Sequence, residues 1–215
     1  MKVTREAILE LLGKGNAYHS CVLTTYNFDP AYFEYTILRA LRGAGVRNTL
    51  VMLDGVQYAK HFHGEGAGEL RSNGAYGIWP VFQKGAFHPK VLMAVGANTG
   101  LLALGSGNLT SGGHGSNDEI WSAFHATGPD SPNAPFFAEA WRMMQDHTSS
   151  ASGSVRERLD WVSEQAPWLA GLAQERAINV DIGNGLASFV VGPEAVLFQL
   201  VAERIGRGKV RRIVV

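Results

Sequence analysis

The 215 residues include 19 Lys plus Arg and 19 Asp plus Glu, so the formal net charge is zero, and 46% of the chain is hydrophobic. This balance is typical of a folded globular protein and excludes a disordered chain. It also excludes a strong overall attraction to nucleic acid or to an anionic membrane, so a surface that binds a polyanion must be local. The single cysteine excludes an internal disulfide, and we find no signal peptide or transmembrane pattern, so we expect a cytoplasmic protein.

The first part of the chain alternates helical and strand patterns. Residues 4–13 have helical spacing, and 20–26 form a β-rich run. Asp29 and Pro30 offer an N-cap and a first-turn proline for a helix over 31–45, before a second buried strand over 48–55. This order predicts a βαβ unit with two parallel strands. The pattern weakens over 56–77, where we expect a surface excursion.

The rest of the chain predicts more strands and helices, and therefore an α/β fold with a mixed sheet flanked by helices. A linker over 148–154 separates two of the predicted helices. The last residues repeat the opening order of helix, glycine turn and strand, which indicates either an internal repeat or two unrelated amphipathic helices. The predicted strands are 76–82, 88–95, 100–106, 119–127 and 186–192, and the predicted helices are 134–148, 154–169 and 194–208.

Residues 88–119 hold the side chains that point to chemistry. His88 and Lys90 are two residues apart, so on a strand an imidazole and an ammonium share one face. Residues 91–95 are continuously apolar, which puts this polar pair at the start of a buried strand. Asn108 follows the next apolar strand within a glycine-rich turn, and a hairpin would bring it back beside the pair.

This arrangement resembles the phospholipase D superfamily, whose hallmark is His-x-Lys, then Gly-Ser-x-Asn, then an acidic or amide residue about a dozen positions on. One element of the common motif, an Asp five residues after the Lys, is replaced here by Val95. The branch that resembles tyrosyl-DNA phosphodiesterases lacks that Asp as well. The residues that match in order are His88, Lys90, Gly105, Ser106, Asn108 and Glu119.

The resemblance implies a phospholipase D-like αβα lobe that hydrolyses a phosphodiester without a metal or other cofactor. His88 would attack phosphorus and form a phosphohistidine, while Lys90 and Asn108 hold the nonbridging oxygens. Glu119 would orient the imidazole, although strand alternation leaves Asp118 as the alternative. Ser106 and His114 are candidate substrate contacts, and the alternative for each is an ordinary turn residue.

In this superfamily a second histidine from a second motif protonates the leaving oxygen, and this sequence contains no second copy. We expect it from a partner chain in a dimer or from sequence beyond Val215. We therefore divide the chain into a catalytic lobe over 1–150, a helical linker and strand over 151–190, and the start of a second lobe over 191–215.

We expect the substrate to be nucleic acid, DNA rather than RNA, and no membrane to take part. Two alternatives stay open: hydrolysis of a phospholipid or another small phosphodiester, and a degenerate lobe that only binds nucleic acid or a protein. His61, His63 and Glu65 could hold a metal ion, but this spacing in a glycine-rich loop is more typical of exposed side chains.

Overall fold

Six strands form one mixed sheet, in the order β3-β2-β1-β4-β5-β6. The computed structural model describes residues 7–63 and 74–172, with short pieces at 180–181, 186–188, 199 and 201–203. β1 pairs in parallel with β2, and β2 with β3, whereas β4, β5 and β6 are antiparallel to their neighbours. The strands are β1 (Ser20–Thr25), β2 (Asn48–Asp54), β3 (Gly77–Val81), β4 (Val91–Val95), β5 (Gly100–Gly105) and β6 (Trp121–Ala126).

The predicted βαβ unit is confirmed. Asp29 accepts a hydrogen bond from the backbone N–H of Tyr32 at 3.0 Å, and Pro30 occupies the first turn, as the cap signal indicated. The connection between the strands is a continuous helical segment with a π-helical turn in its middle. Its parts are α1 (Pro30–Tyr32), η2 (Phe33–Ile37) and α2 (Leu38–Gly43).

The predicted surface excursion over 56–77 begins with a helix that the sequence did not predict, α3 (Gly55–Phe62), whose residues after Gly55 are exposed or half-buried. Asp54 ends β2 and caps this helix, since its Oδ1 accepts from the N–H groups of Val56 and Gln57 at 3.0 Å each. A carboxylate at this position satisfies donors that the first turn leaves without a partner. Residues 64–73 lie outside the described part of the chain.

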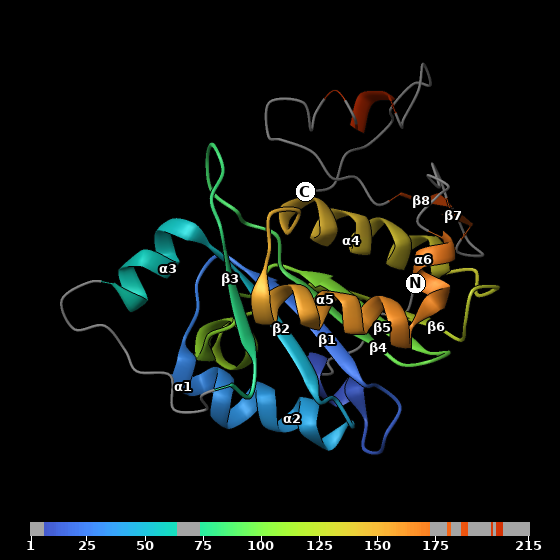
Figure 1. Cartoon of the computed structure of the whole chain (residues 1–215), viewed down its shortest axis with the longest axis horizontal. Helices are drawn as coiled ribbons and strands as arrows, with labels where there is room; N and C mark the ends of the chain where they lie inside the picture. The colour runs from blue at the N-terminus through green and yellow to red at the C-terminus, as the bar shows by residue number, and fades with distance from the viewer. Residues whose placement is uncertain are drawn as a thin grey trace.

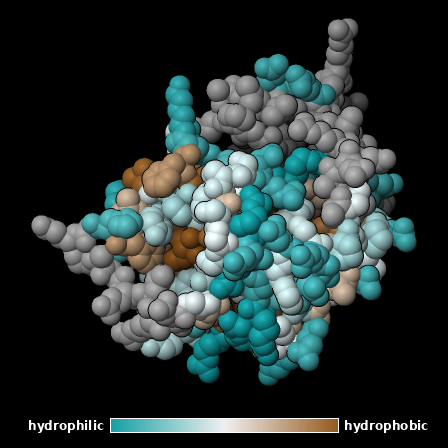
Figure 2. All heavy atoms as spheres, viewed as in Figure 1, coloured by the Kyte–Doolittle hydropathy of each residue, from teal (hydrophilic) through white to brown (hydrophobic). Residues whose placement is uncertain are grey.

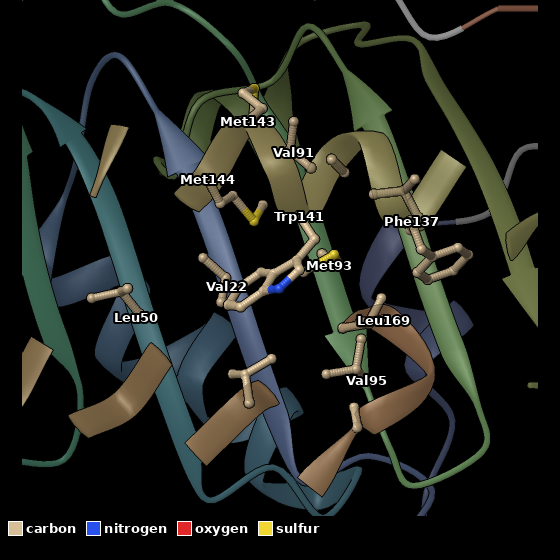
Figure 3. Close-up of a cluster of buried hydrophobic side chains, with 14 of the residues drawn as sticks. Val22, Leu50, Val91, Met93, Val95, Phe137, Trp141, Met143, Met144 and Leu169 are labelled. Carbon is tan, nitrogen blue, oxygen red and sulfur yellow. The ribbon is translucent and has the colours of Figure 1, made fainter. Parts of the chain in front are cut away.

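Two layers of helices cover the two faces of the sheet (Figure 1). One face carries the short 3-10 helix η1 (Ile8–Leu12) with α1, η2 and α2. The other carries α4 (Ala134–His147), α5 (Gly153–Gln165) and α6 (Pro167–Leu172). Trp141 of α4 lies over the sheet among the side chains of Val22 and Met93, and it is 1% exposed (Figure 3). The fold class predicted from the sequence, a mixed sheet flanked by helices, is therefore confirmed.

The C-terminal predictions are only partly covered by the structure. α5 and α6 contribute to the same buried cluster as α4, so residues 153–172 pack on the sheet of the first lobe. β7 (Val180–Asp181) and β8 (Leu186–Ala187) form a small antiparallel pair. The predicted strand over 186–192 is described only at 186–188, where β8 forms its start, and most of the helix over 194–208 and the run 209–215 lie outside the described residues. Among the described residues, none of the helices has the length and apolarity to cross a membrane.

Candidate active site

The predicted site residues come from three places in the sequence that meet at one edge of the sheet. Lys90 directly precedes β4, Asn108 follows β5 in the loop before the π-helical turn η3 (Gly112–Ser116), and Glu119 precedes β6. The pairings Val91 with Leu104 and Gly105 with Trp121 put the start of β4, the end of β5 and the start of β6 side by side. This antiparallel order is what brings Lys90, Asn108 and Glu119, which are 11 to 29 positions apart, to one edge.

His88 and Lys90 are in direct contact. The Lys90 Nζ lies 2.7 Å from Nδ1 and 3.1 Å from Nε2 of the His88 ring, and it donates to the His88 carbonyl oxygen at 2.9 Å. A ring nitrogen accepts from the Lys90 ammonium only when it carries no proton, so a donating ammonium requires the tautomer of His88 in which that nitrogen is unprotonated. The pair precedes β4 instead of lying on it, contrary to the predicted strand over 88–95, because ladder pairing starts at Val91, after Pro89.

The ammonium of Lys90 is largely removed from water, with 6% of the residue exposed. Burial lowers the pKa of Lys90 to about 8, and the negative charge of Glu119 opposes this shift. At neutral pH most Lys90 side chains are still charged, and a partly desolvated charge attracts an anion more strongly than one in bulk water. His88 itself is exposed, so an anion can reach the pair.

The orientation of the Asn108 carboxamide is fixed by the end of β1. Its Oδ1 accepts from the backbone N–H groups of Tyr26 at 3.3 Å and Asn27 at 3.1 Å, and the Thr25 hydroxyl lies 3.3 Å away. Backbone N–H groups can only donate, which assigns this atom as oxygen and not nitrogen. The Nδ2 atom of Asn108 therefore faces away from β1 with its two N–H donors.

The end of β1 connects the His88–Lys90 pair with the Asn108 loop through Thr24, Thr25 and Tyr26. The sequence analysis did not single out these three residues. Thr24 donates to the carbonyl of Pro89 at 2.9 Å and accepts from the N–H of Val91 at 3.0 Å. Thr25 accepts from the N–H of Leu109 at 3.1 Å, one residue after Asn108. The available signal was a pair of threonines ending an otherwise apolar strand.

Tyr26 contacts both the His88–Lys90 pair and the helix α3. Its ring lies beside His88, with centroids 4.9 Å apart, and the Lys90 Nζ is 6.0 Å from the ring centroid. Its hydroxyl accepts from Gln57 Nε2 of α3 at 2.9 Å. An aromatic ring held at both ends in this way restricts the orientation of the imidazole beside it.

Glu119 is held by neighbours other than His88. Its carboxylate accepts from the hydroxyl of Ser106 and from Asn117 Nδ2 at 3.5 Å, while the Ser106 oxygen accepts from the N–H of Ile120 at 3.1 Å. Asp118 is exposed, whereas Glu119 is half-buried and its charge acts on Lys90 and His114. The role predicted for Glu119, orientation of the imidazole, stays a prediction.

His114 lies in the π-helical turn η3, with its ring 5.3 Å from that of Trp121 and 6.4 Å from that of Tyr32. Both ring nitrogens are enclosed, and neither has a hydrogen-bond partner among the described residues. Burial lowers the pKa of His114 to about 4, although the charge of Glu119 opposes the shift, so the ring is neutral at pH 7. The predicted substrate contact of His114 stays a prediction.

The loop around Asn108 needs its glycines because its backbone segments approach one another closely. A Cβ on Gly107 would lie 2.1 Å from the carbonyl oxygen of Gly113, and one on Gly113 would lie 2.2 Å from that of Asn108. Any side chain at either position would push Asn108 away from β1. The glycine-rich composition of 105–113 is therefore a packing requirement of the site.

α3 also reaches this edge, where His61 Nε2 lies 3.1 Å from Asn27 Oδ1. Glu65 is outside the described residues, so the set of His61, His63 and Glu65 is not tested. In the part of the chain that the structure describes, three or more His, Cys, Asp or Glu side chains do not gather as a metal site would require.

Comparisons with known proteins find similarity in structure only. No protein-family profile matches the sequence, and no curated protein matches it. Nuc from Salmonella typhimurium, described as a phospholipase D family member, is 20% identical with a TM-score of 0.44, over 65% of this chain and 84% of that one. NucT from Helicobacter pylori is 14% identical with a TM-score of 0.43, over 66% of this chain and 89% of that one.

A mutant of the yeast tyrosyl-DNA phosphodiesterase is 12% identical with a TM-score of 0.39, over 54% of this chain. The match covers 26% of the yeast chain, so this protein corresponds to about a quarter of its length. These likenesses concern the fold, and one of the structures bears the name of the family that the His-x-Lys and Gly-Ser-x-Asn motif resembles.

Proposed function

We propose that this chain carries half of the active site of a metal-independent phosphodiesterase that cleaves nucleic acid, DNA rather than RNA, in the cytoplasm. The observation that carries the proposal is the contact between the His88 imidazole and the buried Lys90 ammonium, at the same edge as the Asn108 amide, whose oxygen is bound by the end of β1. A nucleophile, a cation and a neutral donor are the groups that a phosphodiester requires.

In the proposed reaction a His88 ring nitrogen attacks phosphorus and forms an N–P bond while the P–O bond to the leaving strand breaks. Lys90 and Asn108 bind the nonbridging oxygens, whose negative charge would otherwise repel the imidazole. An acid outside this half-site gives a proton to the leaving oxygen. The same group then takes a proton from water, which attacks phosphorus, breaks the N–P bond and releases His88.

That acid belongs to a second motif, in a second copy of the chain or in a second lobe. The other half-site must approach the edge at which β4 starts and β5 ends, because His88 is exposed there. A phosphodiester bound between two such halves would be held from both sides, with the nucleophile and the acid on opposite sides of phosphorus, as an in-line displacement requires.

The test is cleavage of end-labelled single-stranded and double-stranded DNA in excess chelator. We expect cleavage by the native protein, none by His88→Ala, and unchanged cleavage by His125→Ala, which replaces an exposed histidine on β6. Phosphate label should remain on the denatured native protein and be absent from His88→Ala. Loss of cleavage with chelator contradicts the proposed mechanism.

The same experiment separates the alternatives. DNA binding without any cleavage, by a protein that contains both half-sites, would favour the noncatalytic lobe. Release of a phospholipid headgroup with no attack on DNA would favour the lipid hydrolase. Both outcomes would overturn the assignment of nucleic acid as the substrate.

A further inference from the structure

A hollow lies at the opposite edge of the sheet from the candidate active site. It has a volume of about 470 Å³ and is formed by the start of β1 and β2 together with α5, and its lining includes His19, Arg47, Asn48, Arg158 and Trp161. His19 precedes β1, whereas the active-site contacts come from its other end, so the two sites are separated by a strand length of roughly 20 Å. Around α5 this face is mostly hydrophilic, and hydrophobic residues gather to the left of the view (Figure 2).

The Arg158 guanidinium is fixed in the wall of this hollow. Nη1 donates to Asn48 Oδ1 at 3.3 Å and Nη2 donates to the carbonyl of Gly74 at 2.9 Å, while Nε is enclosed without a partner among the described residues. A guanidinium has five N–H groups, so these two bonds leave donors for a further acceptor. Asn48 is fixed in turn, because its Nδ2 donates to the carbonyl of Arg158 at 2.8 Å.

Positive charge accumulates here without a matching number of carboxylates. The pKa of Arg42 is lowered by burial and then by the charges of Arg47 and Arg158, which places three guanidinium groups near one another. Within the described residues the one ion pair is Arg142 with Glu139, on α4. Glu157 also lines the hollow and raises the pKa of Arg158, so the lining holds two guanidinium groups and one carboxylate, with the charge of Arg42 nearby. This excess of positive charge favours an anionic ligand such as a phosphate monoester, which carries roughly −1.5 to −2 at pH 7.

Trp161 adds a flat aromatic surface to this cationic hollow. It is 47% exposed although it is a large hydrophobic residue, and it belongs to neither buried cluster of the sheet. An exposed indole beside fixed guanidinium groups can stack on a nucleobase while they bind its phosphate. The volume of the hollow lies within the range of small-molecule sites, about 300–1,000 Å³.

We infer that this hollow binds a nucleoside phosphate, with the phosphate on Arg47 and Arg158 and the base on Trp161. The ligand is either a free nucleotide or the phosphorylated end of a nucleic-acid strand, because both present the same chemistry. The inference does not depend on the proposed nuclease activity, since no residue of the hollow belongs to the candidate active site.

Isothermal titration of the whole chain with each of the four nucleoside monophosphates, with adenosine and with inorganic phosphate tests this inference. We expect at least one monophosphate to bind about tenfold more tightly than adenosine or phosphate alone, because it engages both parts of the hollow. Trp161→Ala and Arg47→Ala should each weaken that binding about tenfold, since a stacked base and a charged pair each contribute on this scale. Both side chains are exposed, and Arg47 loses only its hydrogen bonds to the carbonyls of Arg42 and Val46, so both variants should stay folded in a thermal-unfolding measurement.

Arg39→Ala is the matched control, because Arg39 is an exposed arginine on α2 that does not line the hollow. Titration of His88→Ala protein with single strands bearing a 5′-phosphate or a 5′-hydroxyl distinguishes the two sources. If the phosphorylated strand binds more tightly than any monophosphate, and this binding depends on Arg47, the ligand is a strand end. If the two bind equally, the ligand is the free nucleotide.

Three results would overturn the inference. The first is that neither a monophosphate nor a phosphorylated strand binds. The second is binding that Trp161→Ala and Arg47→Ala leave within twofold of the native protein. The third is inorganic phosphate binding as tightly as every monophosphate, because the indole would then contribute nothing.

Discussion

Replacing Asn108 by aspartate separates the two functions of the carboxamide, which are to anchor the loop through Oδ1 and to donate to the phosphate through Nδ2. The variant keeps an oxygen where Tyr26 and Asn27 donate at 3.3 and 3.1 Å, so the loop should stay in place and the free energy of unfolding should change by less than about 1 kcal/mol. In the variant a carboxylate oxygen replaces the Nδ2 group that faces away from β1, and its negative charge repels the phosphate. Losing one preorganised donor costs roughly 10²–10³ in rate, and with the added repulsion we expect kcat/KM to fall at least about 10³-fold.

Thr25→Val is the contrasting variant, because it perturbs the anchor and leaves the amide. It removes the hydroxyl that accepts from the buried N–H of Leu109, which should cost about 1–3 kcal/mol of stability. Tyr26 and Asn27 still hold Asn108, so the rate should fall only about tenfold. The two variants therefore have opposite profiles, one stable and inactive, the other destabilised and active.

The assay combines urea unfolding with hydrolysis of bis(4-nitrophenyl) phosphate and of a labelled oligonucleotide, at a temperature where both variants are folded. The reasoning fails if Asn108→Asp retains activity within tenfold of the native protein. It also fails if Thr25→Val loses more activity than Asn108→Asp, since the anchor would then matter more than the donors.

Three further predictions concern pH and the cap of α3. Because the pKa of Lys90 is lowered to about 8, kcat/KM should decline as pH rises through about 8, and Lys90→Arg should abolish that decline in a pH–rate profile. The pKa of His114 is lowered to about 4 in the folded state, so its contribution to stability is lost as pH falls below 6.5. The free energy of unfolding, measured with urea, should therefore differ between pH 7 and pH 5 by about 2 kcal/mol less in His114→Leu than in the native protein. Asp54→Ala removes the cap of α3 and leaves the N–H of Phe87 without its acceptor at 2.8 Å, so the free energy of unfolding should fall by about 2–4 kcal/mol. Asp160→Ala, which replaces an exposed acid on α5, should leave the free energy of unfolding unchanged.

The sequence predicted those elements whose signals are local. The βαβ unit followed from two apolar runs and the cap at Asp29. α3 was missed because it is 8 residues long and its first-turn donors depend on Asp54, which also ends β2. The start of β4 was placed at His88 instead of Val91, because the pattern of residues does not reveal where the ladder with β1 begins.

For the site, the His-x-Lys and Gly-Ser-x-Asn spacing and its resemblance to a known family selected His88, Lys90 and Asn108, and the return of the β4–β5 hairpin was predictable because it is local geometry. The sequence did not reveal that hydrogen bonds from Thr24 and Thr25 hold the segments around these residues in place. These threonines bond to residues 65 and 84 positions away, a separation at which a sequence pattern carries no information about contact.

The sequence by itself determined which chemical groups are present and that they meet at one edge of an α/β sheet. Only the tertiary structure decided their state: the lowered pKa of Lys90, the contact of its ammonium with the His88 ring and the orientation of the Asn108 amide. Each of these states depends on burial or on donors from a distant strand. Chain folding, not local order, brings that strand to the site.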